Sequence, residues 1–299
     1  MLEFKKAELA DKMWVDECLL HCESYNCEYT FGNLFIWSTS YFTRICHYKD
    51  FLIIRWGREP EDYSYSVPIG QGDFREALDA IISTCIDEGH PFRIYGITES
   101  YVAKIKSCYD DDKFTITFDD GNFDYIYSVE KMASLSGKKY HSKRNHISNF
   151  KRTYPDWSFE TIDESNIDEC IALHTKWIEE KDENDSDYSF EFEAVLNSFQ
   201  YFKELELIGG LIRVDGDVVA YTVGEGMKNG KCFVTHFEKA PPEMNGAYTI
   251  INQEFTKNCL MSYEWVNREE DLGLEGLRKA KQSYYPEIWL KKGLAVYNG

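Results

Sequence analysis

The chain has 299 residues and carries 52 Asp and Glu against 33 Lys and Arg, which gives a formal net charge of −19. Because so acidic a surface repels phosphate backbones and anionic lipid, general nucleic-acid binding, including DNA binding, is not expected. A hydrophobic fraction of 43% and an aromatic fraction of 16% exclude intrinsic disorder, and the length predicts about two domains.

Hydrophobic periodicity in the first half predicts one helix, a group of strands, and then two helices that alternate with strands. The second predicted helix has Asp73 at its N-cap and Glu76 in position to complete a capping box. We expect helices over 5–23, 74–88 and 100–109, and strands over 41–47, 51–56, 64–69, 92–97, 114–118 and 124–128.

The second half predicts a similar order, with two helices ahead of an antiparallel meander. Asn166 is the expected N-cap of the first helix, and Asp215-Gly216 and Asn229-Gly230 are typical two-residue hairpin turns. We expect strands over 158–162, 207–214, 218–227, 231–238, 263–266 and 287–296, and helices from 167 onward and over 190–204, 245–259 and 273–283. The acidic stretch 179–193 is interpreted as a solvated loop.

This order of elements resembles that of the Gcn5-related N-acetyltransferase fold, and it occurs in both halves. We therefore predict an α/β (α+β) protein of two tandem acetyltransferase-like domains, each a mixed, mainly antiparallel sheet flanked by helices. The expected domains are 1–128, the more divergent, and 129–299, which contains a basic helix over 138–152.

The nine cysteines include no C-x-x-C pair, which indicates a reducing compartment and no metal site. The first twenty residues contain no uninterrupted apolar segment, and no apolar run approaches 18 residues. We therefore expect a cytoplasmic protein with no membrane span.

Specific segments resemble a known family. LSGKKYHSKRNHISNF (135–150), GGLIRVDGDVVAYTVGE (209–225), MNGAYTIINQEF (244–255) and VNREEDLGLEGLRKAKQSYYP (266–286) are similar to an uncharacterised bacterial family related to the C-terminal domain of phosphatidylglycerol lysyltransferase. The resemblance implies a tandem acetyltransferase-like fold shared with the Fem peptidyltransferases, which use aminoacyl-tRNA donors. The full lysyltransferase carries a multi-span membrane region ahead of this domain, and its absence here argues against a lipid acceptor.

The basic segment 138–152 is the most unusual stretch, with six Lys and Arg and no acid in fifteen residues. Its apolar positions recur at helical spacing, so the opposite face would present cations. Lys143, Arg144 and Asn145 are candidates for binding a donor phosphate or a tRNA acceptor end, with Arg144 the best bidentate ligand. The alternative is a helix that pairs with the protein's own acidic surface.

A second group of polar residues follows the predicted strand 263–266. In open α/β sheets, ligands bind at the carboxyl ends of the strands. Asn267, Arg268, Arg278 and Lys281 are candidate donor-binding residues, and the family resemblance favours Lys281 as the basic residue shortly before Pro286. Asp271 is either part of the site or a cap for the next helix.

Transfer of an acyl group to an amine requires a neutral amine, a polarised carbonyl and a protonated leaving group. The candidate bases near the central strands are Glu225, His236, Glu238 and Asp271, and the sequence does not single out one of them. For His236 the competing interpretation is a hydrogen-bonded structural histidine.

Binding of CoA would require a glycine-rich loop at a helix N-terminus. Gly246 fits such a loop, whereas Glu243 places a negative charge beside the pyrophosphate and Tyr248 replaces a small residue. The loop argues against ordinary CoA binding.

We therefore expect an acyl or aminoacyl transferase that acts on a small-molecule or peptide acceptor through an amine or hydroxyl, with aminoacyl-tRNA as the favoured donor. One alternative is a CoA-dependent N-acyltransferase that uses acyl-CoA. A third possibility, of another class, is a non-catalytic ligand-binding module on the same fold.

Overall fold

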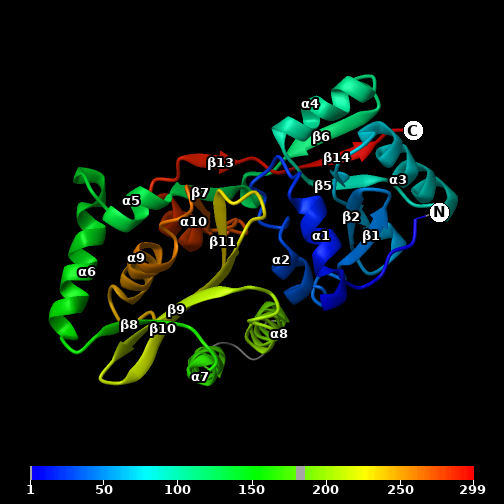
Figure 1. The fold of residues 1–299 in the computed structure, drawn as a ribbon. Coiled ribbons are helices and arrows are strands. Elements are labelled where there is room, and N and C mark those ends of the chain that lie inside the picture. The colour runs from blue at the N-terminus through cyan, green and yellow to red at the C-terminus, as the bar shows by residue number, and fades with distance from the viewer. Residues whose placement is uncertain (1, 180–185) are drawn as a thin grey trace.

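The computed structural model describes residues 2–179 and 186–299 and consists of two mixed sheets flanked by helices (Figure 1). The chain termini lie on the first sheet, at one end of the molecule. Part of the predicted acidic loop 179–193, residues 180–185, falls outside the described residues. Residues 186–193 of that stretch are helical, because α8 spans Ser186–Gln200 rather than the expected 190–204.

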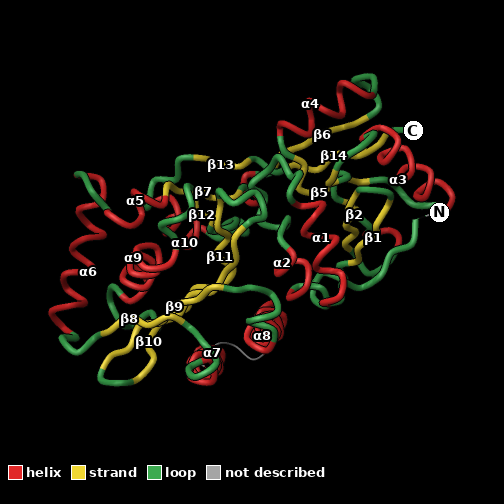
Figure 2. Tube along the Cα trace, in the orientation of Figure 1, coloured by secondary structure: helices red, strands yellow, loops and turns green. Residues whose placement is uncertain are grey.

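The first sheet has the strand order β1-β2-β3-β5-β14-β6, with β4 also paired to β2. Its helices pack around these strands (Figure 2). The elements are η1 (Leu9–Asp11), α1 (Lys12–Leu19), α2 (Phe31–Ile36), β1 (Arg44–Tyr48), β2 (Phe51–Trp56), η2 (Pro60–Asp62), β3 (Ser64–Tyr65), β4 (Ile69–Gly70), α3 (Phe74–Glu88), β5 (Arg93–Ile97), α4 (Glu99–Cys108), β6 (Phe114–Phe118), η3 (Asp120–Asn122) and β14 (Gly293–Tyr297).

The second sheet has the order β13-β7-β12-β11-β10-β9-β8, antiparallel except for the parallel pair β11 and β12. Helices α5, α6 and α9 lie on one side of it (Figure 1). The elements are β7 (Asp124–Ser128), α5 (Val129–Ser134), η4 (Lys138–Tyr140), α6 (His141–Thr153), β8 (Ser158–Thr161), α7 (Ile167–Glu179), α8, β9 (Ile208–Val214), β10 (Asp217–Gly226), β11 (Cys232–Lys239), α9 (Ala247–Cys259), β12 (Trp265–Asn267), α10 (Glu275–Gln282) and β13 (Ile288–Leu290).

Two strands lie in the sheet of the other half of the chain. β7 precedes residue 129 but pairs with β12 and β13 of the second sheet, and β14 returns from the far end of the chain to pair with β5 and β6 of the first. Sheet membership therefore does not follow the expected division into 1–128 and 129–299. Strand periodicity identifies each strand but not its partner.

The predicted strand 287–296 is two strands, because Lys291 and Lys292 separate β13 from β14. The predicted helix 5–23 is also shorter. Lys5 forms an antiparallel bridge with Ile45 through two backbone hydrogen bonds of 3.0 and 2.8 Å, and Glu8 and Asp11 form a capping box at η1. Helical structure therefore starts at residue 9. The short helices α2 and α5 were not predicted from the sequence.

The apolar core is shared between the two sheets. One cluster joins the first sheet to the face of the second that carries Tyr221, Val223 and Val234, whereas the opposite face packs on α5, α6 and α9 through residues such as Ala220 and Phe233. No helix among the described residues is long and apolar enough to cross a membrane.

Candidate functional site

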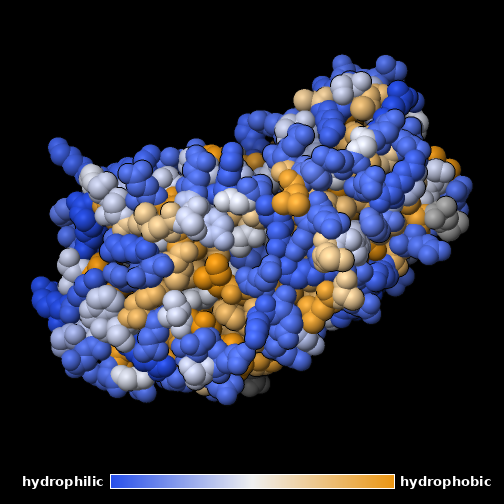
Figure 3. Space-filling view, viewed as in Figure 1, coloured by the Kyte–Doolittle hydropathy of each residue, from blue (hydrophilic) through white to orange (hydrophobic). Residues whose placement is uncertain are grey.

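The divergence of two strands opens a cleft at the junction of the sheets. β11 and β12 pair at three positions, from Cys232 with Trp265 to Val234 with Asn267. Beyond Val234, β11 continues to Lys239, while the chain after Asn267 turns away into a loop. A cleft of about 1230 Å³ lies there, lined by β11, this loop, α10 and residues of the first half. Hydrophobic residues gather over β11, between α9 and α2, on a face that is otherwise largely hydrophilic (Figure 3).

The structure brings five of the twelve predicted site residues to this cleft: Lys143, His236, Glu238, Arg268 and Lys281. Glu225 lies directly behind one of them. The remaining predicted residues do not line the cleft: Arg144, Asn145, Gly246, Asn267, Asp271 and Arg278. The cleft thus draws on the basic segment and on the 267–281 region, but through a subset of each.

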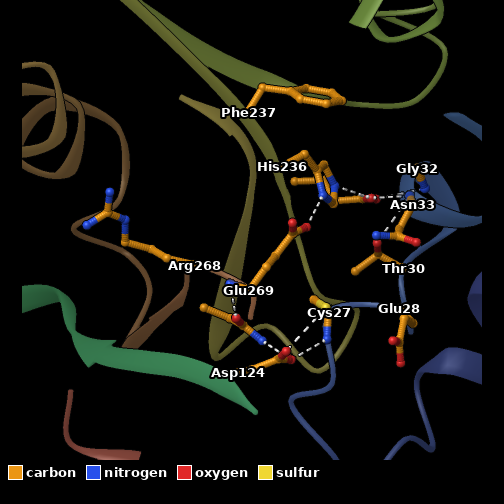
Figure 4. A network of polar contacts seen from close by, with 12 residues as sticks. Cys27, Glu28, Thr30, Gly32, Asn33, Asp124, His236, Phe237, Arg268 and Glu269 are labelled. Carbon is orange, nitrogen blue, oxygen red and sulfur yellow. Dashed lines mark hydrogen bonds and ion pairs between the residues drawn. The ribbon is translucent and has the colours of Figure 1, made fainter. Parts of the chain in front are cut away.

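A chain of three charged groups runs from one wall of the cleft to the residues behind it. His236 Nε2 lies 2.9 Å from Glu225 Oε1, and His236 Nδ1 lies 3.1 Å from Glu269 Oε1 (Figure 4). Burial opposes a charge on the imidazole, but the hydrogen bonds with the two carboxylates raise the pKa of His236 to about 9. The ring is therefore a cation at neutral pH with both nitrogens engaged, and it is not available as a base.

Glu225 ties this chain to the first half of the molecule. Its two oxygens accept hydrogen bonds from the backbone N–H groups of Gly32 and Asn33, at 3.1 and 3.0 Å, in the first turn of α2. Burial alone would raise the pKa of Glu225, but the hydrogen bonds from His236, the Thr30 side chain and the Gly32 N–H lower it. Glu225 is a structural anion rather than a free base.

The opposite wall is cationic. Lys143 Nζ lies 3.8 Å from the centroid of the Tyr284 ring, and the Arg268 guanidinium lies 5.2 Å from the same ring. Burial and the neighbouring Arg268 lower the pKa of Lys143 to about 8. Arg268 is bound to Glu238 at 2.7 Å, so this predicted base is engaged in an ion pair.

Lys281 is held on the same side by the backbone. Its Nζ donates to the carbonyl oxygens of Arg268, at 2.6 Å, and Glu270. An ammonium group has three N–H donors, which leaves one for a ligand. Burial lowers the pKa of Lys281.

Asn267, Asp271 and Arg278 shape the loop from outside the cleft. Asn267 Nδ2 donates to Asp124 Oδ2 at 2.8 Å, and Asp271 is held bidentately by Arg278, at 2.7 and 3.1 Å. Burial opposes ionisation of Asp271, but the hydrogen bonds from Arg278 and Tyr125 lower its pKa. Its Oδ1 also accepts the N–H of Gly273, in keeping with a structural role just before α10.

Beneath the cleft, Lys292 is buried with 1% of its side chain exposed. Its Nζ lies 2.8 Å from Asp124, 3.2 Å from Glu28 and 3.3 Å from Glu270, and Cys27 is also adjacent. Cys27, Asp124 and Glu270 could offer three metal ligands within 4.8 Å of one another. The lysine ammonium already provides the cation at their centre, so this donor set does not fit a metal ion.

The rest of the basic segment faces away from the cleft. Arg144 Nη1 donates to the carbonyls of Leu135 and Gly137, and Asn145 is exposed beside His141. Lys151 forms an ion pair with Glu254 at 3.2 Å. Of these contacts, the Lys151–Glu254 ion pair is of the kind expected for the alternative, a helix that pairs with the protein's own acidic surface, whereas Arg144 binds backbone carbonyls.

The N-terminus of α9, the expected site of a CoA pyrophosphate, is closed by α6. Gly246 is its N-cap with φ of 94°, and a Cβ atom there would lie 2.6 Å from the carbonyl oxygen of His146. A backbone carbonyl at this point repels a phosphate. The geometry therefore strengthens the sequence-based argument against ordinary CoA binding.

Replacing Gly246 by alanine tests this packing. Gly216 has the same φ of 94° in open space, so Gly216→Ala carries the left-handed strain alone, about 1 kcal/mol. We expect Gly246→Ala to lower the free energy of unfolding by a further 1–3 kcal/mol, roughly the cost of overpacking. Urea denaturation of both variants measures the difference, and equal losses would show that α6 does not press on Gly246.

Several residues in and beneath the cleft were not predicted as site residues from the sequence. Glu269, Glu28 and Lys292 were not predicted, because Glu28 and Lys292 come from segments remote in sequence. Glu269 follows two predicted residues directly, and its place in the run Arg268-Glu269-Glu270 was the available signal.

The chain is similar in sequence or fold to several solved structures. A conserved protein of unknown function from Bacteroides thetaiotaomicron is 35% identical, with a TM-score of 0.94 and full coverage of both chains. L-PGS of Bacillus licheniformis is 17% identical with a TM-score of 0.63, over 86% of this chain and 84% of that one. FemX is 10% identical with a TM-score of 0.58, over 97% and 96%.

The last two similarities concern the fold alone. A tandem GNAT protein, 8% identical with a TM-score of 0.50 over 99% of this chain and 98% of that one, confirms the predicted tandem acetyltransferase-like architecture. The family model described as phosphatidylglycerol lysyltransferase, C-terminal, matches residues 21–296, a range that includes both sheets and every cleft residue discussed above. The chain therefore belongs to the phosphatidylglycerol lysyltransferase C-terminal family.

Proposed function

We propose that this protein transfers an aminoacyl group from an activated ester, with aminoacyl-tRNA as the favoured donor, to an amine or hydroxyl acceptor. The observation that carries the proposal is the cleft between the two sheets, where the cations Lys143, Arg268 and Lys281 face the His236–Glu269 pair. Membership of an aminoacyl-transferring family supports the same reaction class.

The two walls suit the two ends of such a donor. The cationic wall would bind the phosphate and ribose end, and Arg268 and Lys281 would stabilise negative charge that develops on the carbonyl oxygen. The acidic residues Glu28 and Glu270 at the other wall would favour the ammonium group of the aminoacyl moiety. Charge pairing of this kind orients the ester in one direction across the cleft.

Lys143 provides the first test of donor binding. Lys143→Met removes the charge at similar side-chain length, and we expect it to weaken binding of charged tRNA about tenfold, the loss of one charge-assisted contact. Because the pKa of Lys143 is about 8, wild-type affinity should fall as the pH rises through 8. Lys143→Arg should keep its affinity through that range. Filter binding at several pH values measures both effects.

The matched control is Lys138→Met, an exposed lysine at the start of the same segment. Equal losses for the two methionine variants would point to general electrostatic attraction rather than a site in the cleft.

Transfer itself is measured with tRNA that carries a radiolabelled amino acid, offered phosphatidylglycerol vesicles, a short peptide or methylamine. Transfer to any of these acceptors above the enzyme-free rate is the expected result. Donor binding without transfer or hydrolysis would favour a non-catalytic binding module instead. A thermal shift with acetyl-CoA and none with tRNA would favour the CoA-dependent alternative.

A further inference from the structure

Glu269 has one carboxylate oxygen held and the other open. Oε1 is fixed by His236 Nδ1 at 3.1 Å, whereas Oε2 accepts no hydrogen bond from the backbone of 2–179 and 186–299 or from the described side chains, which are those of 2–179 and 190–299. The side chain lines the cleft and keeps 22% of its surface exposed. Among the candidate bases discussed above, Glu225, Glu238 and Asp271 are engaged by N–H or guanidinium donors.

The backbone at Glu269 is held in a costly conformation. Its φ is 57°, in the left-handed region that non-glycine residues rarely adopt. The Asn267 side chain accepts the Glu269 N–H at 2.7 Å, and the Glu269 carbonyl accepts the N–H of Tyr125 at 3.2 Å. Strain that the surroundings enforce in this way clusters at functional sites, and here it turns the carboxylate toward His236 and the cleft (Figure 4).

The groups around Glu269 prepare it to receive a proton. Burial raises the pKa of Glu269, while the imidazolium of His236 opposes that rise and keeps the carboxylate in place. Glu270 and Lys281 are the other charged groups that act on it, with opposite signs. A carboxylate with a raised pKa is a stronger base than one on the surface.

From this geometry we infer that Glu269 is the catalytic base of the transfer, and that His236 and Glu225 are positioning residues that hold it. The inference rests on the proposed function. The acceptor nitrogen or oxygen forms a bond to the carbonyl carbon, and its proton passes to Glu269 Oε2. The ester C–O bond then breaks, and the same proton passes to the departing ribose oxygen. Glu269 ends the cycle as a carboxylate, so no other reactant is needed.

Glu269→Gln is the decisive variant because the amide oxygen can still accept the His236 N–H, so the fold should survive. We expect kcat for transfer to fall by about 10²–10⁴-fold, the usual contribution of a general base. KM and the binding of charged tRNA should change less than threefold. The matched control, Glu264→Gln, replaces an exposed glutamate just before β12 and should keep full activity.

A second readout separates proton transfer from structure. Methoxyamine is a weakly basic amine that is neutral at the assay pH, whereas methylamine is protonated. The fold decrease in transfer rate caused by Glu269→Gln should therefore be smaller with methoxyamine than with methylamine, after the enzyme-free rate is subtracted. If Glu269→Gln keeps a transfer rate within twofold of wild type, the inference about Glu269 is overturned and the proposed function is not. Wild-type inactivity with every acceptor, water included, would overturn the proposed function and this inference with it.

Discussion

Lys292→Met should lower the free energy of unfolding by about 3–5 kcal/mol or more, the usual effect of removing one partner from a buried ion pair. Three carboxylates, from Asp124, Glu28 and Glu270, lie within 2.8–3.3 Å of the Lys292 ammonium. Methionine fills a similar volume but leaves these anions buried without a cation. Equilibrium urea denaturation at pH 7 measures the loss.

The adjacent lysine is the matched control. Lys291 is 51% exposed and pairs with Glu99, which is 69% exposed. Because an exposed ion pair contributes about 0–1 kcal/mol, Lys291→Met should be nearly neutral. A similar small loss for Lys292→Met would show that water or protonation already compensates the buried acids.

A compensating substitution tests the cause of the loss. Asp124→Asn removes the carboxylate nearest to Lys292 while an amide can still contact Asn267. In the Lys292→Met background it should recover part of the lost stability, because one fewer anion stays buried without a partner. In the wild-type background the same change should destabilise, and this sign reversal identifies an electrostatic coupling.

The fold could be predicted from the sequence because the signals for its helices and hairpins are local. Turn residues such as Asp215-Gly216 and a cap such as Asp73 fix where hairpins and helices start, and the structure confirms both: β9 pairs with β10 across the first, and Asp73 accepts the Glu76 N–H. The partners of β7 and β14 could not be predicted, because an alternating strand of five residues fits the edge or the centre of either sheet. The bridge between Lys5 and Ile45 is non-local in the same way.

The candidate site was predicted in part for a related reason. Polar residues after β12 were expected near a ligand from topology alone, and Arg268 and Lys281 do line the cleft. Asn267 and Asp271 were predicted as site residues for the same reason. The type of a polar residue does not show whether its side chain supports the fold or binds a ligand. Glu269 differs from them because one of its carboxylate oxygens faces the cleft without a hydrogen bond from a described residue. Such a difference depends on side-chain contacts, which the spacing of residues in the sequence does not specify.

His236→Gln should produce the second large effect, and its size should depend on pH. The imidazole is fully buried, and its pKa is raised from an ordinary value near 6.5 to about 9 by the two carboxylates. A raised histidine pKa stabilises the folded state fully below pH 6.5, and this stabilisation is lost as the pH rises through 9. The shift corresponds to roughly 3 kcal/mol at pH 6.

We therefore expect His236→Gln to be less stable than wild type by roughly 3 kcal/mol at pH 6, with a difference that shrinks steadily toward pH 9.5. His141→Gln, at an exposed position, is the control and should cost under about 0.5 kcal/mol throughout. A difference that does not vary with pH would mean that the buried ring is neutral. Glu225 binds the backbone amides of α2 as well as the His236 ring. Loss of the imidazolium charge should therefore weaken the contact between the two halves of the molecule and the positioning of the Glu269 carboxylate. Stability and transfer rate should then decline over the same pH range.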